Sequence, residues 1–143
     1  MKALLVSACL LGCDCKYSGG NNALPDETLA ALRREYRLIP VCPEVAGGLP
    51  TPRIPAERRE GRVVTRDGRD VSAQFAKGAQ VALALAQKYG CERALLKERS
   101  PSCGSRAVYD GSFSGTLVPG MGFTAETLQN AGVEVMSEEQ IKE

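Results

Sequence analysis

The stretch ALLVSACLLG, residues 3–12, indicates the fold class because it joins a strongly apolar run to a cysteine and a glycine. The run from Ala3 to Ala8 is rich in leucine and valine and lacks the strict alternation of a strand with one solvated face. It predicts a strand that is buried on both faces. Such strands belong to mostly parallel sheets covered by helices on both sides.

Strand-like runs and helical periodicity alternate along the rest of the chain. Pro25 and Asp26 begin a predicted helix whose apolar positions 29, 32 and 36 share one stripe. Asp70 is placed to cap a long helix that ends at Gly90. Other predicted elements are strands at 38–41, 94–97 and 133–135, a small hairpin around 67–68, a helix at 124–128 that stops by Gly132, and a capping box of Ser137 and Gln140. The pattern predicts an α/β fold: one Rossmann-like, three-layer domain over residues 1–143 with a mostly parallel sheet.

Charge and hydropathy exclude several classes of protein. The 18 lysines and arginines nearly balance the 17 acidic residues, so we do not expect stable binding to nucleic acid. The longest apolar run, residues 3–11, is far below the roughly 20 residues that span a bilayer, and it lacks the flanks of a secretory signal. We expect a cytoplasmic protein without a membrane partner, and the sequence leaves the oligomeric state open.

The chain has six cysteines and no histidine. In a cytoplasmic protein the cysteines are expected to be reduced, which favours metal ligation or redox chemistry over disulfides. The absence of histidine excludes zinc sites with histidine ligands and catalysis by Cys-His or Ser-His-Asp groups. Proton transfer must then fall to carboxylates, lysine, tyrosine, hydroxyls or water.

Three of the cysteines follow predicted strands directly. Cys9 comes after the first strand, Cys42 closes the second, and Cys103 lies in the loop after the third. The carboxyl ends of parallel strands share one edge of a sheet, and ligands bind at that edge. We therefore expect these three cysteines to converge there, and Cys91, which precedes the third strand, to lie at the opposite edge.

The loops around Cys42 and Cys103 are built for close contact with a ligand. CPEVAGGLPTPR, residues 42–53, contains three prolines and two glycines, and SPSCGS, residues 100–105, surrounds its cysteine with hydroxyl and amide donors. No C-x-x-C pair supports structural zinc, whereas three thiolates on a four-iron cluster would leave one iron open to substrate. CLLGCDC, residues 9–15, leaves other ligand sets and a redox pair of Cys13 and Cys15 open.

Four motifs together resemble the thiouracil desulfurases, a small bacterial family long labelled as of unknown function. The motifs are VSACLLG at 6–12, CPEVAGGLPTPR at 42–53, LLKERSPSCG at 95–104 and YDGSFSG at 109–115. The resemblance implies a 4Fe-4S enzyme that removes sulfur from a thiolated pyrimidine, such as 4-thiouracil or its nucleotide, and releases sulfide. It further implies three cysteine ligands and one open iron, with Cys9, Cys42 and Cys103 as the ligands and Glu44 and Ser100 as catalytic residues. Cys13, Cys15 and Cys91 fall outside the shared motifs and are expected to be structural or auxiliary.

The residues themselves suit a non-redox, hydrolytic reaction. An open iron would polarise the thiocarbonyl group, and Glu44, two residues from a ligand, is the best candidate to activate water. The candidate substrate-binding residues are Arg53, Tyr17, Ser102 and Lys97. Two other classes of function stay open: a non-catalytic iron-sulfur or persulfide carrier, and a thiol redox protein.

Overall fold

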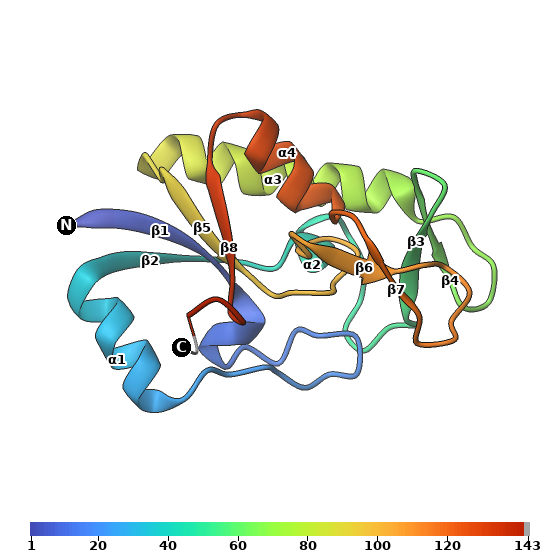
Figure 1. Cartoon of the computed structure of the whole chain (residues 1–143), viewed down its shortest axis with the longest axis horizontal. Helices are drawn as coiled ribbons and strands as arrows, with labels where there is room; N and C mark the ends of the chain where they lie inside the picture. Colours follow the sequence, from blue (N-terminus) through green and yellow to red (C-terminus); the bar gives the residue numbers. More distant parts are fainter. Residues whose placement is uncertain (142–143) are drawn as a thin grey trace.

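The computed structural model describes residues 1–141 and is built around a central sheet of four parallel strands (Figure 1). The strands are β1 (Lys2–Ser7), β2 (Tyr36–Val41), β5 (Arg93–Leu96) and β8 (Glu134–Ser137), in the order β2-β1-β5-β8. Leu4, Leu5 and Val6 of β1 are fully buried. The prediction of a doubly buried first strand is therefore confirmed.

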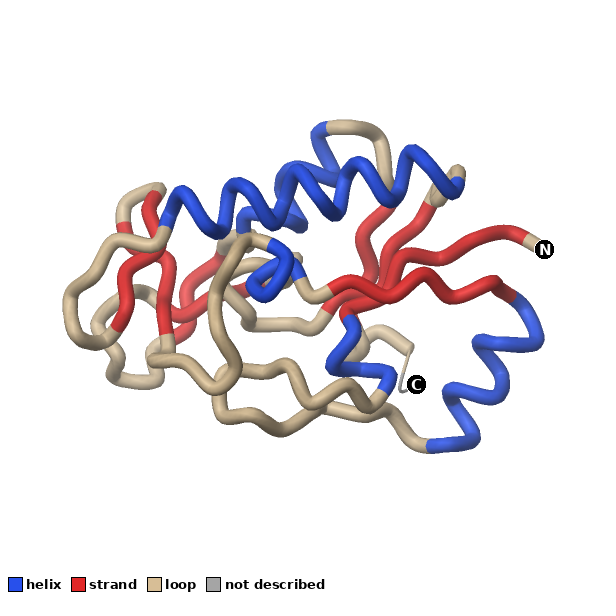
Figure 2. Tube along the Cα trace, turned by 180° about the vertical axis from the view of Figure 1, so that it is seen from behind, coloured by secondary structure: helices blue, strands red, loops and turns tan. Residues whose placement is uncertain are grey.

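Helices cover both faces of this sheet (Figure 2). One face carries α3 (Ser72–Tyr89) and α4 (Phe123–Asn130), and the other carries α1 (Asp26–Glu35) and the 3-10 helix η1 (Ala8–Leu11). Side chains alternate between the two cores: Leu5 packs on the α3 side, whereas Leu4 and Val6 pack with Leu29 of α1. The three-layer α/β prediction is confirmed.

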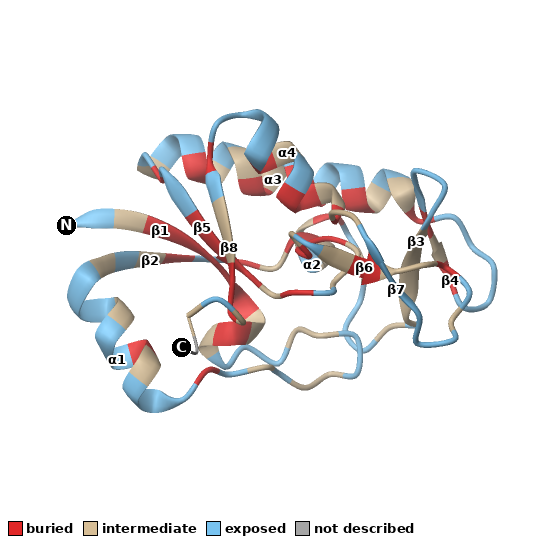
Figure 3. Ribbon diagram, in the orientation of Figure 1, coloured by how far each residue is buried: buried red, intermediate tan, exposed pale blue. Residues whose placement is uncertain are grey.

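Two small hairpins lie beyond the carboxyl edge of the central sheet (Figure 1). One pairs β3 (Ala56–Arg59) with β4 (Arg62–Thr65), and the other pairs β6 (Ala107–Tyr109) with β7 (Leu117–Pro119). Figure 3 shows burial concentrated where the sheet meets the helices, with long exposed stretches in the hairpins. Around residues 67–68, where a small hairpin was predicted, the chain turns back on β4: an antiparallel bridge joins Val64 to Asp70, and the N–H groups of Thr65 and Val71 donate to the carbonyls of Arg69 and Val63.

Local boundaries differ from the predictions at three places. Tyr36 is extended and begins β2, so its assignment to the helical stripe of α1 was wrong. Val71, not Asp70, is the N-cap of α3, although the Asp70 carboxylate accepts the N–H of Ser72 at 2.8 Å. The Gln140 side chain accepts the Ser137 N–H at 2.7 Å, as a capping box requires, but residues 138–140 form a turn.

Candidate functional site

A pocket of about 870 Å³ opens at the carboxyl edge of the central sheet, where the strand ends meet the hairpins. All the predicted site residues except Ser102 line it. Those that do are Cys9, Cys42, Cys103, Glu44, Ser100, Arg53, Tyr17 and Lys97.

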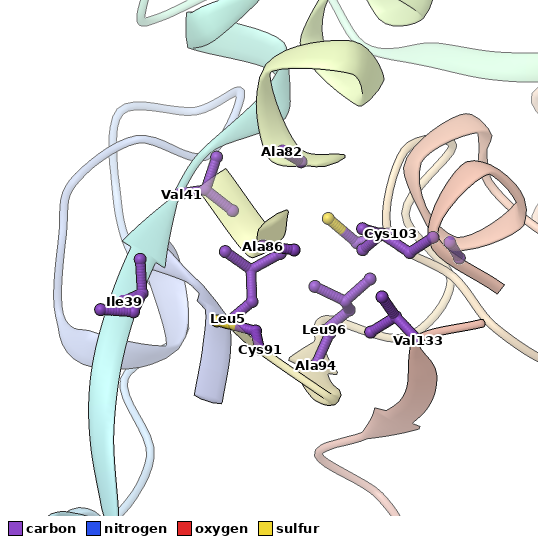
Figure 4. Packing of buried hydrophobic residues seen from close by; sticks show 12 residues of the cluster. Leu5, Ile39, Val41, Ala82, Ala86, Cys91, Ala94, Leu96, Cys103 and Val133 are labelled. Atoms are coloured by element: carbon purple, nitrogen blue, oxygen red, sulfur yellow. The ribbon is translucent and has the colours of Figure 1, made fainter. Parts of the chain in front are cut away.

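Three cysteines converge on this pocket from the ends of different strands. Cys9 lies in η1 after β1, Cys42 is the N-cap of the short helix α2 (Pro43–Ala46) after β2, and Cys103 follows β5. In Figure 4, Cys103 and Cys91 lie at different ends of the same apolar cluster. Cys91 precedes β5 and therefore lies at the edge of the sheet opposite the pocket.

The pKa values of the thiols are raised mainly by burial and further by the neighbouring thiols. Burial raises the pKa of Cys103 to about 12, and the charges of Glu44, Cys9 and Cys42 act in the same direction, while a hydrogen bond with Ser7 opposes them. Burial likewise raises the pKa of Cys9, against a hydrogen bond with Asn22. Crowded thiolates of this kind are stabilised by a bound cation or cluster, because the metal supplies the missing positive charge.

The turn that carries Cys42 and Glu44 is fixed by direct contact between two backbones. A Cβ on Gly78 in α3 would lie 1.9 Å from the carbonyl oxygen of Pro43, and a Cβ on Gly47 would lie 1.9 Å from that of Gln74. Only glycine permits such an approach. The packing of α2 on α3 therefore sets the position of the second thiol and of the nearby carboxylate.

Glu44 forms a partly buried ion pair with Arg53. Oε2 of Glu44 lies 3.0 Å from Nη2 of Arg53, and the exposed fractions of the two side chains are 20% and 5%. Burial raises the pKa of Glu44 even though Arg53 opposes the shift. Within residues 1–141, Oε1 of Glu44 accepts no hydrogen bond, so it is available to water or substrate.

The guanidinium group of Arg53 is largely used within the protein. Its Nη1 and Nη2 atoms contact the carbonyls of Pro50 and Cys15, the hydroxyl of Thr51 and the carboxylate of Glu44. Only the buried Nε lacks a partner among the described residues. Arg53 was predicted to bind substrate, but most of its donors are used within the protein, where they hold Glu44 and the loop of Cys15 together.

The loop of Cys103 is organised by hydroxyl groups, of which one was assigned wrongly. The Ser100 hydroxyl oxygen accepts the N–H groups of Ser102 and Cys103, both at 3.0 Å. Ser102 is fully buried, and its hydroxyl bonds that of Thr124 in α4 at 2.7 Å. The predicted substrate contact of Ser102 is thus replaced by a structural bond to α4, which the sequence could not reveal because Thr124 is distant in the chain.

Lys97 and Tyr17 remain at the pocket. Nζ of Lys97 pairs with Oε2 of Glu138 at 2.9 Å and donates to the backbone carbonyl of Glu98 at 3.0 Å. The positive charge of Lys97 nevertheless favours the thiolate of Cys9. Tyr17 is half-exposed at the pocket, and its backbone oxygen accepts the N–H of Arg53.

A fourth cysteine, expected from the sequence to be structural or auxiliary, also lies at the pocket. Cys15 lines the same cavity, and its carbonyl oxygen lies 3.7 Å from the sulfur of Cys42. Burial and the proximity of Cys42 raise the pKa of Cys15. The C-x-C spacing was the available signal, but it does not reveal which cysteine turns inward. All six cysteines are free, so Cys13 and Cys15 form no disulfide.

The donor set fits an iron-sulfur cluster better than a single ion. Within residues 1–141, no three cysteine or acidic side chains are grouped closely enough to hold one metal ion. A multi-iron cluster takes one thiolate per iron, so its ligands are spaced more widely than those of a single ion. Four cysteines around one pocket, without histidine, match this requirement.

The fold and the pocket define a class: an α/β enzyme with a thiol-lined site at the carboxyl edge of a parallel sheet. The profile of the 2-thiouracil desulfurase family matches residues 4–140, and the chain belongs to that family, whose activity is the cleavage of C–S bonds.

Two individual relatives are similar to this chain over nearly its whole length. The "uncharacterized protein YbbK" of Bacillus subtilis (strain 168) is 39% identical over 150 residues, covering 98% of each chain. The solved structure of the [4Fe-4S]-dependent thiouracil desulfidase TudS (DUF523Vcz) is 48% identical, with a TM-score of 0.94 over 99% of this chain and 94% of that one. In this chain, no helix within residues 1–141 is long and apolar enough to cross a membrane.

Proposed function

We propose that this chain is a 4Fe-4S-dependent desulfurase that hydrolyses a thiolated pyrimidine, 4-thiouracil or its nucleoside or nucleotide, to the oxo base and sulfide. One observation carries the proposal: thiols from the ends of three strands share a pocket with a partly buried carboxylate. The family membership and the cluster dependence of TudS support it. The proposal treats residues 1–143 as one domain.

Cys9, Cys42 and Cys103 are the proposed ligands. A four-iron cluster held by these three thiolates would leave one iron without a protein ligand, and that iron would supply a thiophilic Lewis acid for the thiocarbonyl sulfur. Water provides the oxygen of the product, and its protons leave with the sulfide, so the overall hydrolysis transfers no electrons.

The side chains around the thiols would move the protons. Oε1 of Glu44 accepts the proton of the attacking water, while Arg53 holds Oε2 and fixes the direction of the carboxylate. The raised pKa of Glu44 makes its carboxylate a stronger base. The Ser100 hydroxyl already accepts two backbone N–H groups, which leaves its own proton free to bond the substrate.

The size and lining of the pocket support a substrate that extends beyond one ring. The cavity continues past the thiols to a wall that includes Arg66 and Phe113, with the guanidinium carbon 5.6 Å from the ring centroid. A basic group at that end suits the phosphate of a nucleotide. Tyr17 and Lys97 border the same cavity, and we propose that they contact the base and the departing sulfur.

The test is a Glu44→Gln variant assayed without oxygen. Glutamine keeps the size of the side chain and can still accept a bond from Arg53, but it is a very weak base. We expect full cluster loading and a rate lower by about 10²- to 10⁴-fold, measured as loss of 4-thiouracil absorbance together with sulfide release.

Glu92→Gln is the matched control, because Glu92 is exposed at the opposite edge of the sheet and, among residues 1–141, its side chain pairs only with Lys2. Desulfuration at the normal rate by cluster-loaded Glu44→Gln would exclude Glu44 as the base. A cluster-loaded wild type that acts on no thiopyrimidine would instead favour the carrier function.

A further inference from the structure

Glu98 is a nearly buried carboxylate at the end of β5, and the proposed reaction does not use it. Its side chain is 3% exposed. Oε1 lies within hydrogen-bond distance of four backbone N–H groups: those of Arg99 at 3.3 Å, Ser105 at 3.0 Å, Arg106 at 3.1 Å and Ala107 at 3.3 Å. Oε2 accepts the Ser105 hydroxyl at 3.2 Å. One side chain thus accepts hydrogen bonds from four backbone N–H groups and one hydroxyl.

These donors lie on both sides of Cys103. Arg99 precedes the cysteine, and residues 105–107 follow it, so the carboxylate closes the base of the loop that carries the third thiol. The middle of the loop is held by the start of α4, where the N–H groups of residues 123–125 donate to the carbonyls of Pro101 and Ser102, whereas its two ends depend on Glu98. Arg99 is held at a φ of +68°, a conformation that is unfavourable for a residue with a side chain. Without the carboxylate, several of these N–H groups would lose their partner, which is costly where they are buried.

The backbone of Glu98 is itself anchored to a residue near the far end of the chain. The backbone N–H of Glu98 donates to Oε1 of Glu138 at 2.7 Å, and Oε2 of Glu138 pairs with Lys97. Burial would raise the pKa of Glu98, but its backbone hydrogen bonds outweigh that effect, so the pKa is lowered and the group is ionised at neutral pH. A charged acceptor binds such N–H groups more strongly than a neutral one.

We propose that Glu98 is a positioning residue that holds the loop of Cys103 in the geometry required to retain the cluster. The inference rests on the proposed function, because it takes Cys103 as a ligand. Glu98 touches neither the cysteine sulfur nor the proposed reacting groups in any described hydrogen bond, so it acts through the backbone.

The experiment compares Glu98→Ala and Glu98→Gln with the wild type in two measurements. The first is the rate at which cluster-loaded protein loses its iron-sulfur absorption to a chelator. Groups that orient metal ligands commonly change metal affinity by about 10- to 100-fold, so we expect release to be about that much faster in Glu98→Ala. Glutamine keeps a carbonyl acceptor for the N–H groups, so we expect the release rate of Glu98→Gln to lie between those of the wild type and Glu98→Ala.

The second measurement is alkylation of individual cysteines in the full chain without cluster, followed by mass spectrometry. Cys103 and Cys91 are similarly buried, at 5% and 6% exposure, but Cys91 lies at the opposite edge of the sheet. We expect Glu98→Ala to speed the labelling of Cys103 by at least about tenfold relative to Cys91, because only one loop loosens. Glu57→Ala is the matched control, since Glu57 accepts two backbone N–H groups in the 110–116 loop and none near a cysteine.

The two measurements separate the positioning role of Glu98 from the proposed cluster-dependent function. Equal acceleration at Cys103 and Cys91 would mean general destabilisation, and unchanged labelling of Cys103 would mean that the loop does not need Glu98; either result overturns the inference. A wild type that binds no cluster would overturn the proposed function, while the alkylation measurement would still decide whether Glu98 holds the loop.

Discussion

Gly78→Ala tests whether the contact between α2 and α3 sets the geometry of the site. The added Cβ would lie 1.9 Å from the carbonyl oxygen of Pro43, whereas ordinary contacts begin at 3.4 Å, so the two helices must separate by about 1.5 Å. Overpacking of this kind costs about 1–3 kcal/mol, and the better helix propensity of alanine returns about 1 kcal/mol. We expect a net loss of up to about 2 kcal/mol in the free energy of unfolding.

We expect the Gly78→Ala variant to lose more activity than its lower free energy of unfolding alone would explain. Pro43 stands between Cys42 and Glu44, so the displacement moves a proposed ligand and the proposed base together. A misplacement of about 1 Å can cost about 10²-fold in rate.

Urea unfolding of cluster-free protein gives the stability, and visible absorption with sulfide release gives cluster content and rate. Gln80→Ala is the control, because Gln80 is exposed on the same helix. If Gly78→Ala matched this control in stability, cluster content and rate, the argument from backbone contact would be refuted.

Two further predictions follow from the thiols and from Glu98. Serine in place of any one proposed ligand should abolish iron-sulfur absorption and activity together, while Cys91→Ser should keep both; an essential Cys15 beside a dispensable Cys42 would show that the ligand set is wrong. The lowered pKa of Glu98 means that its contribution to stability is present above its ordinary value of 4.5 and is lost as the pH falls through the lower folded value. In urea titrations of cluster-free protein at decreasing pH, the wild type should therefore lose stability more steeply than Glu98→Gln, and parallel curves would contradict the assignment.

The sequence predicted those parts of the fold that depend on local pattern. The apolar run of β1 and the periodic residues of α3 are visible without any tertiary contact. The convergence of three cysteines followed from strand order, since each stands at the end of a strand. By contrast, β3 has the sequence AERR, and this polar strand forms only because β4 pairs with it.

Roles that depend on distant partners could not be predicted. Arg53 matches the family motif, but its use within the protein depends on the carbonyl of Cys15, 38 positions away. Ser100 and Ser102 lie in one turn, yet only the fold shows that Ser100 lines the pocket and that Ser102 bonds α4. The role of Glu98 was hidden for a similar reason, because its partners are backbone groups that carry no residue-specific signal.

The placement of the three thiols also bears on whether the sheet forms before or after a cluster is inserted. Each thiol follows a different strand, and β1 must pair with both β2 and β5 before the thiols meet. A short peptide containing any one motif has only part of the donor set, unlike a zinc finger, whose closely spaced ligands let the metal direct folding. With the proposed ligand set, the sheet would form first, and the folded chain would then accept its cluster.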